Sequence, residues 1–224
     1  MMLVNAEELT KVYRRGGEKI VALQNVDLQI AAGSFVFVVG PSGGGKSTLL
    51  HLIGGMDRPS SGRLTVNGFA IHQASEDELT HFRRHHIGFV FQFFNLLASL
   101  NALDNVCLPL LTNGRRLKEA RKLSAAVLRQ VGLEARQRHK PAELSGGEQQ
   151  RVAIARAVVG KPSLVLADEP TGDLDAANAE AVMQLMLELN RSLGVTFVVA
   201  THNEALTRLG DQVYELHAGQ LRGR

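Results

Sequence analysis

The chain is poor in cysteine, in net charge and in uninterrupted apolar runs. Cys107 is its one cysteine, which excludes an intrachain disulfide framework and a cysteine-based zinc site. Its apolar neighbours predict that Cys107 is a buried small hydrophobic residue. The formal net charge of the 224 residues is +3. This weak excess predicts at most a mildly basic face and does not indicate a nucleic-acid partner.

A membrane-spanning segment is excluded by the distribution of apolar residues. The most apolar long window, residues 87–111, is interrupted by Gln92, Asn95, Asn101, Asp104, Asn105 and Pro109. Residues 1–13 lack the apolar core of a signal peptide, so we expect a cytoplasmic protein. Hydrophobic residues make up 45% of the chain, enough for a sizeable core, and the length fits one domain or one domain with a subsidiary lobe.

Strand patterns alternate with helix patterns along the chain. Four apolar runs are typical of strands buried on both faces: residues 35–40, 87–92, 163–170 and 195–202. Further strands are expected at residues 26–30, 62–68 and 213–216. Ser75 and Glu78 predict a capping box for a helix that ends near residue 85. Two other helices are expected to bury one face each, with Leu117, Ala120, Val127, Leu128 and Val131 on the first and Val182, Leu185, Leu189 and Leu193 on the second. The alternation predicts an α/β protein with a mostly parallel sheet.

Each of the four buried runs ends in a chemically capable group. A glycine-rich loop follows the first run, Gln92 the second, Asp168 and Glu169 the third, and His202 the fourth. Because parallel strands deliver their carboxyl ends to the same edge of a sheet, where such sheets bind ligands, we expect these groups to converge on one site.

The glycine-rich loop, GPSGGGKST, satisfies the motif G-x-x-x-x-G-K-[ST] between a strand pattern and a helix pattern, which identifies a P-loop. Its glycines let backbone N–H groups approach phosphate oxygens, and the following helix adds its positive N-terminal end. Lys46 is expected to reach the β and γ phosphates, and the Ser47 hydroxyl to bind Mg²⁺. The expected phosphate-binding residues are Gly40, Pro41, Ser42, Gly43, Gly44, Gly45, Lys46, Ser47 and Thr48.

The other strand ends supply candidates for hydrolysis. Asp168 is expected to bind Mg²⁺ directly or through water, and Glu169 to orient and polarise the attacking water. We expect His202 to contact the γ-phosphate or that water, although a lone histidine is often structural. Gln92 is a candidate ligand of the metal or the water.

Two aromatic features have simpler alternatives. Tyr13 is a candidate for stacking on an adenine ring, and an ordinary surface tyrosine fits the sequence nearly as well. His81, His85 and His86 have helical spacing that suits zinc. The arginines beside them indicate a charged exterior face instead, so we do not expect metal binding there.

The motifs GPSGGGKST, Gln92, LSGGEQQ, LVLADEPTGDLD and ATH, in this order and spacing, resemble the ABC ATPases, the nucleotide-binding subunits of ATP-binding cassette transporters. LSGGEQQ resembles the signature motif of that family. The resemblance implies ATP and Mg²⁺ as ligands and a head-to-tail dimer with a second copy. Ser145, Gly146 and Gly147 of one subunit would then bind the γ-phosphate held by the P-loop of the other. Residues 172–175 would form a loop across the dimer, and Gln92 would lie in a nucleotide-sensing loop.

The same resemblance implies a RecA-like P-loop core with an N-terminal antiparallel β part and an inserted helical lobe. The core would comprise about residues 1–92 and 162–224, and the helical lobe about residues 93–161. Residues 93–111 are a candidate surface for gripping a permease, with core packing of the helical lobe as the alternative.

The finer pattern resembles the branch that serves lipoprotein release, macrolide export and cell division. This implies a separate integral-membrane permease as partner and attachment to the inner face of the cell membrane through it. The alternatives are a DNA-repair or chromosome-associated ATPase, a ribosome-associated ATPase and a nucleotide-dependent clamp with little turnover. The first would require a long coiled-coil insertion or zinc hooks between the P-loop and the signature, and the second usually fuses two cassettes.

Overall fold

The computed structural model describes residues 1–224, apart from the side chain of Arg15. The strands are β1 Met2–Arg15, β2 Glu18–Ala31, β3 Phe35–Val39, β4 Ser61–Val66, β5 Phe69–Ala70, β6 Ile87–Val90, β7 Leu164–Asp168, β8 Thr196–Thr201, β9 Gln212–His217 and β10 Gln220–Gly223. The α-helices are α1 Lys46–Ile53, α2 Glu76–His86, α3 Ala102–Thr112, α4 Leu117–Gln130, α5 Gly146–Val158 and α6 Ala176–Leu193. Short 3₁₀ helices are η1 Glu134–Arg136, η2 Pro141–Glu143 and η3 Glu204–Leu209.

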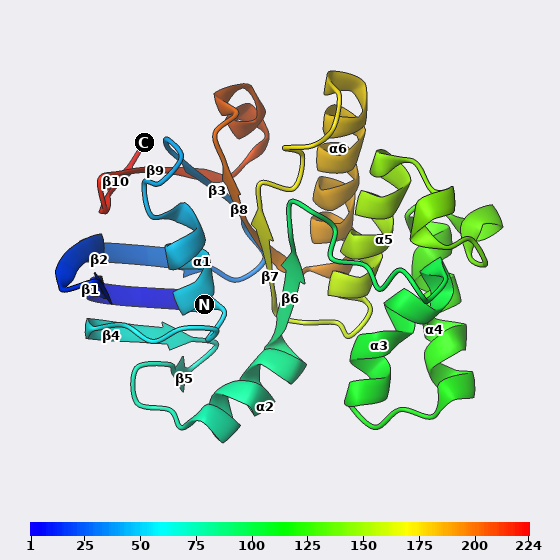
Figure 1. Cartoon of the computed structure of the whole chain (residues 1–224), viewed down its shortest axis with the longest axis horizontal. Helices are drawn as coiled ribbons and strands as arrows, with labels where there is room; N and C mark the ends of the chain where they lie inside the picture. The colour runs from blue at the N-terminus through cyan, green and yellow to red at the C-terminus, as the bar shows by residue number, and fades with distance from the viewer.

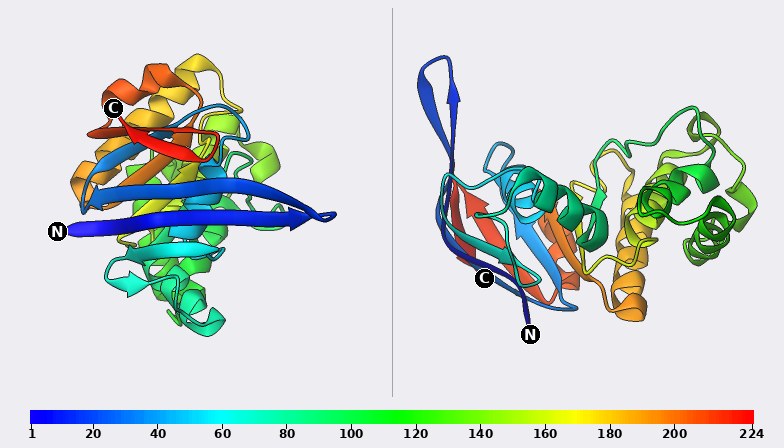
Figure 2. Two further views of the ribbon diagram at one scale, coloured as in Figure 1. Left: turned by 90° about the vertical axis from the view of Figure 1, so that its left-hand side faces the viewer. Right: turned by 90° about the horizontal axis from the view of Figure 1, so that it is seen from below.

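Two sheets organise these elements (Figures 1 and 2). A four-stranded antiparallel sheet has the order β2-β1-β4-β5, and a six-stranded sheet has the order β10-β9-β3-β8-β7-β6. Within the larger sheet, β9, β3, β8, β7 and β6 are parallel and β10 is antiparallel to β9. The predicted α/β class, the mostly parallel sheet and the N-terminal antiparallel part are therefore confirmed.

The six-stranded sheet is buried on both faces because its apolar residues alternate between two cores. Phe35, Phe37 and Phe197 belong to the core that contains α3, α4, α5 and α6. Val36 and Val38 belong to the core that contains α1, α2 and the four-stranded sheet. Side chains of successive strand residues point to opposite faces, so a continuous apolar run is what a doubly covered strand requires. In consequence α1 and α5 pack on opposite faces of the sheet.

One of the four predicted buried strands has a different environment. β6 is the edge strand of the larger sheet, and Ile87 and Phe89 are only half-buried. The predicted burial on both faces is therefore only partial here: Gly88 and Val90 are buried, whereas Ile87 and Phe89 pack, partly exposed, against the core that contains α1. The sequence also did not predict β10 or the full length of β1 and β2.

The predicted helix features are largely present. The Ser75–Glu78 capping box is confirmed at the start of α2, and Cys107 is fully buried. Two residues assigned to buried helix faces are exposed instead: Leu117 is 49% and Leu193 40% exposed. They are the first residue of α4 and the last of α6, where the helix projects beyond its neighbours. Among the described residues, no helix is both long enough and apolar enough to cross a membrane.

β6 and α5 approach each other closely at Gly88, which generates a prediction about stability. A Cβ atom added to Gly88 would lie 2.2 Å from the carbonyl oxygen of Ala157, whereas one added to Gly160 would meet no atom within 4 Å. We expect Gly88→Ala to lower the free energy of unfolding by about 1–3 kcal/mol because helix and strand must separate. Urea denaturation measures this, with Gly160→Ala as the control. Equal unfolding midpoints for the two variants would contradict the packing described.

Candidate functional site

A cavity of about 350 Å³ opens at the carboxyl edge of the six-stranded sheet. P-loop residues form one wall, and residues from β2 and from the ends of β6 and β7 form the others. The lining residues are Ile20, Val21, Ala22, Ser42, Gly43, Gly45, Lys46, Ser47, Thr48, Gln92, Asp168 and Glu169. The P-loop, Gln92 and the Asp168–Glu169 pair thus converge on one cavity as predicted, and His202, the fourth predicted group, bonds Glu169 without lining the cavity.

The backbone of the P-loop requires glycine at Gly40 and Gly45. Gly40 has φ 153° and Gly45 has φ 104°, values that favour glycine. A Cβ on Gly40 would lie 2.0 Å from the carbonyl oxygen of Leu216, and one on Gly45 would lie 2.4 Å from that of Ala22. Gly45 is the N-cap of α1, and no side chain caps that end of the helix. The first N–H groups of α1 therefore face the cavity as donors for an anion.

Lys46 is held deep in the loop. Its side chain is 7% exposed, and Nζ donates hydrogen bonds to the carbonyl oxygens of Gly40 (2.8 Å) and Pro41 (3.1 Å). Nζ also lies 3.5 Å from Glu169 Oε1. Gly40 and Pro41 therefore orient the ammonium through their carbonyl groups.

Glu169 lies between two cationic or potentially cationic groups. Its second carboxylate oxygen, Oε2, lies 3.0 Å from His202 Nδ1 and 3.3 Å from the His202 backbone nitrogen, which donates to it. Glu169 itself has φ 46°, and its N–H donates to the Ala200 carbonyl on β8. A non-glycine residue in this region of backbone space costs about 1–3 kcal/mol, and such residues cluster at functional sites. The geometry thus aims a carboxylate into the cavity beside Lys46 and next to His202.

The residues present fit a magnesium ion. Asp168 is the last residue of β7, and its Oδ1 is buried with no hydrogen-bond partner among the described protein atoms. The Ser47 hydroxyl and the Gln92 amide line the same cavity, and Gln92 Nε2 donates to Asp173 Oδ1 at 3.4 Å. Mg²⁺ is bound through one or two carboxylates together with substrate phosphates. An unpaired carboxylate oxygen beside a phosphate cradle supplies that combination.

Tyr13 lies on β1 next to the strand that lines the cavity. Its hydroxyl donates to Asp57 Oδ2 at 2.8 Å, and Lys11 Nζ lies 4.8 Å from the ring centroid. Burial and the bond to Asp57 raise the pKa of Tyr13. Tyr13 does not itself line the cavity, but its cross-strand partner Ile20 does. Stacking of Tyr13 on adenine therefore stays a prediction.

The sequence did not predict that β2 forms an apolar wall of the cavity. Ile20 and Val21 are 47% and 50% exposed and, with Ala22, line the cavity opposite the P-loop. Such a surface suits the face of a nucleobase. No sequence signal identified this wall, because the exposure of Ile20 and Val21 and the pairing of Ile20 with Tyr13 are known only from the structure.

The signature residues lie at the other face of the sheet. Ser145 caps α5: its Oγ accepts from the Glu148 N–H at 3.3 Å, and its own N–H donates to Glu148 Oε2 at 2.8 Å. These bonds, together with Arg136, lower the pKa of Glu148. A Cβ on Gly147 would lie 2.7 Å from Asn178 Oδ1, so glycine lets α5 approach α6.

Ser145, Gly146 and Gly147 do not line the P-loop cavity of the same chain. In Figure 1, α1 and α5 lie on opposite sides of β7 and β8. This capped helix N-terminus is therefore available to a phosphate outside the chain's own cavity.

Comparisons with known proteins agree with this geometry. A family described as "ABC transporter" matches residues 23–172. The lipoprotein-releasing system ATP-binding protein LolD of Coxiella burnetii is 50% identical, with 98% of this chain and 94% of that protein covered. The LolD protein of Legionella pneumophila strain Paris is 46% identical, with 100% and 98% covered.

Solved structures are similar as well. The ATP-binding cassette MJ0796, in a dimeric post-hydrolysis state bound to ADP and Pi, superposes with a TM-score of 0.90 at 44% identity. The superposition covers 99% of this chain and 97% of the MJ0796 chain. A second dimeric structure of MJ0796 has a TM-score of 0.90 at 45% identity with the same coverage.

Lys46 generates a prediction about triphosphate binding. Replacing Lys46 by Ala removes a charge-assisted hydrogen bond to phosphate, an interaction worth about 1.5–3 kcal/mol. We expect the dissociation constant for a nucleoside triphosphate to rise by about 10–100-fold, measured by isothermal titration calorimetry. Lys118→Ala, an exposed change in α4, is the control. Undiminished affinity in Lys46→Ala would show that the loop does not hold the phosphates.

Proposed function

The chain belongs to the ABC transporter family, and we propose that it is the ATP-hydrolysing subunit of a membrane system that releases lipoproteins. The observation that carries the proposal is full-length similarity, at 46–50% identity, to proteins named as ATP-binding subunits of lipoprotein-releasing systems. The branch that the sequence resembles includes these systems. The similarity also favours transport over a role in DNA repair or chromosome structure.

ATP would bind with its triphosphate on the P-loop and its base against the apolar wall from β2. Ser42 to Thr48 surround the phosphates, and Lys46 Nζ, now bonded to the carbonyls of Gly40 and Pro41, would exchange these acceptors for phosphate oxygens. Ile20 and Val21 would cover one side of the adenine, with Tyr13 stacking nearby. The P-loop wall of the cavity thus matches the charged end of the nucleotide, and the β2 wall matches its apolar end.

Hydrolysis would be carried out by Glu169 with His202. The Glu169 carboxylate is positioned to accept a hydrogen bond from the attacking water, and the His202 imidazole to hold that carboxylate and contact the γ-phosphate. Ser47, Gln92 and Asp168 would hold Mg²⁺ against the phosphates. When bound, the ion neutralises charge that develops on the transferred phosphoryl group.

We propose that the second phosphate-binding element acts on a second copy. Gly146 and Gly147 present the N-terminus of α5, and Ser145 its hydroxyl, away from the chain's own cavity. In a head-to-tail dimer each copy would complete the nucleotide site of the other. The dimeric state of the MJ0796 structures supports this arrangement. Residues 172–175 follow Glu169 and would lie at the same seam.

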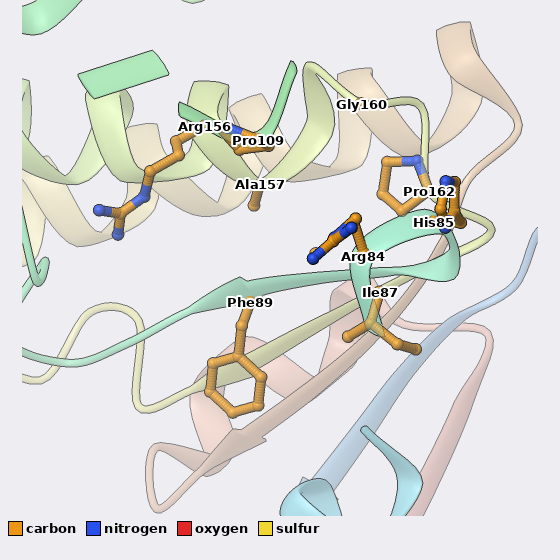
Figure 3. Close-up of a pocket in the computed structure, with 10 residues that line it drawn as sticks. Arg84, His85, Ile87, Phe89, Pro109, Arg156, Ala157, Gly160 and Pro162 are labelled. Carbon is orange, nitrogen blue, oxygen red and sulfur yellow. The ribbon is translucent and has the colours of Figure 1, made fainter. Parts of the chain in front are cut away.

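The membrane partner would dock where the lobes meet. We propose a core lobe of residues 1–92 and 162–224 and a helical lobe of residues 93–161. Between them lies a groove of about 140 Å³, lined by residues that include His85, Phe89, Pro109, Arg156 and Pro162 (Figure 3). A cytoplasmic segment of the permease placed there would hold the subunit at the inner face of the cell membrane.

Residues 93–111 were expected either to grip a permease or to pack in the core of the helical lobe, and different parts of the segment suit each role. Phe93 and Leu97 are 72% and 49% exposed, whereas Val106, Cys107 and Leu110 are buried in the core. The first part of the segment is therefore the part available to grip a permease, and the second part holds α3 in the helical lobe.

Glu169 tests the hydrolytic mechanism. In Glu169→Gln the shape is kept and the charge that polarises water is lost, so we expect turnover to fall by about 10²–10⁴-fold while ATP binding persists. Size-exclusion chromatography with ATP and Mg²⁺ should then show a stable dimer, because the contacts across the seam are no longer released. Glu188→Gln, an exposed change in α6, is the control. A Glu169→Gln protein that stays monomeric would refute completion of the site by a second copy.

The cargo is tested with a permease that co-purifies with the chain. The complex is reconstituted in phospholipid vesicles, and its ATPase rate is measured with an acylated lipoprotein and with the same protein lacking acyl chains. We expect stimulation by the acylated form alone. Stimulation by a macrolide instead of a lipoprotein would rule out lipoprotein release and assign the chain to the export part of the branch.

A further inference from the structure

The segment that joins β6 to α3 contains two consecutive residues in the left-handed region. Phe94 has φ 50° and Asn95 has φ 49°. Neither is a glycine, and such backbone persists only where the surroundings hold it in place. The contacts of this turn therefore identify what fixes its shape.

The turn is held by an arginine of the signature helix. Arg156 lies on α5, and its Nη2 donates to the Phe94 carbonyl at 2.8 Å while its Nη1 donates to the Asn95 carbonyl at 2.5 Å. The planar fork of the guanidinium suits two acceptors that lie side by side. Burial lowers the pKa of Arg156, the direction expected for a cation withdrawn from water. Arg156 thus bonds both carbonyls of the left-handed turn.

The same turn lies between the nucleotide cavity and the signature. Gln92, which lines the cavity, precedes Phe94 by two residues. On the other side, a Cβ built on Gly146 would lie 3.9 Å from Cζ of the Phe94 ring and 3.4 Å from Leu174. Moving the turn would therefore move both the amide of Gln92 and the packing at the start of α5.

The far end of the segment is anchored separately. Asn105 is fully buried, accepts a hydrogen bond from the Leu97 N–H, and donates to the carbonyls of Leu97, Leu100 and Asn101. β6 holds the beginning of the segment and Asn105 holds its end. The turn between them takes its position from Arg156.

We propose that Arg156 is a positioning residue that locks the Phe94–Asn95 turn against the signature helix and so sets the place of Gln92 in the nucleotide site. The proposal rests on the role of Gln92 in the proposed function. Arg156 is also one of the residues that line the groove between the lobes (Figure 3). A permease segment bound in that groove would therefore contact Arg156, the residue that holds the turn.

Hydrogen exchange tests the contact without nucleotide and so separately from the proposed ATPase. In Arg156→Met, which keeps the apolar stem and removes the fork, we expect the amides of residues 93–96 to exchange about tenfold faster or more, while those of Leu97, β3 and β8 are unchanged. Arg129→Met, at an exposed arginine that pairs with Glu134, is the control. Unchanged exchange at residues 93–96 would overturn the proposal.

Turnover and rescue test the positioning role. We expect Arg156→Met to lower the maximal ATPase rate about tenfold, with Mg²⁺-free ATP affinity unchanged because the P-loop is intact. Adding Asn95→Gly should restore part of that rate, since glycine adopts positive φ without the arginine, and Arg156→Lys should retain part of it. A double variant no faster than Arg156→Met, at equal thermal stability, would show that Arg156 acts elsewhere than on the turn.

Discussion

The hydrogen-bonded register of β3, β8 and β7 is the constraint on which the nucleotide site depends. Val39 pairs with Thr201, and Ala200 pairs with Asp168. Gly40 follows Val39, His202 follows Thr201 and Glu169 follows Asp168. Three segments that are far apart in the chain therefore leave the sheet side by side. Because successive strand residues point to opposite faces, a slip of one residue in β7 would turn Asp168, its last residue, away from the P-loop. The two apolar cores prevent such a slip, since it would also expose the phenylalanines and valines that cover the sheet.

Charge around Glu169 is arranged for a substrate that is itself an anion. The carboxylate has Lys46 on one side and His202 on the other, and only 16% of its side chain is exposed. Lys46 is satisfied by carbonyl groups of its own loop, so phosphate oxygens would replace neutral acceptors with charged ones at little cost in reorganisation. Asp168 has a buried oxygen that no described protein group satisfies, and a buried unpaired acceptor is costly. A cation carried in with the phosphates would relieve it.

The P-loop and the signature, which we propose as two phosphate-binding elements, belong to different faces of the same sheet. α1 extends from the P-loop into one core and α5 extends from the signature into the other, so a single chain cannot bring both to one triphosphate. α5 nevertheless contacts segments next to the chain's own site, because it packs on β6 at Gly88 and bonds the turn after Gln92 through Arg156. One helix therefore bonds the turn that follows Gln92, and in the proposed dimer its N-terminus would face the partner. Closure of the proposed dimer would therefore act both on the N-terminus of α5 and on the turn after Gln92.

The sequence by itself determined the parts whose physics is local. A strand, a glycine loop and a helix in succession make a phosphate cradle, the capping box at Ser75 starts a helix from a few neighbouring residues, and apolar runs predict strands. The order of motifs also indicated the family. Tertiary structure alone decided that β6 is an edge strand, that Leu117 and Leu193 lie at exposed helix ends, and that Ile20 to Ala22 face the P-loop. It also decided that Arg156 holds the turn after Gln92. These outcomes depend on contacts between residues far apart in the chain. A local sequence pattern does not indicate which distant element will pack against a given residue.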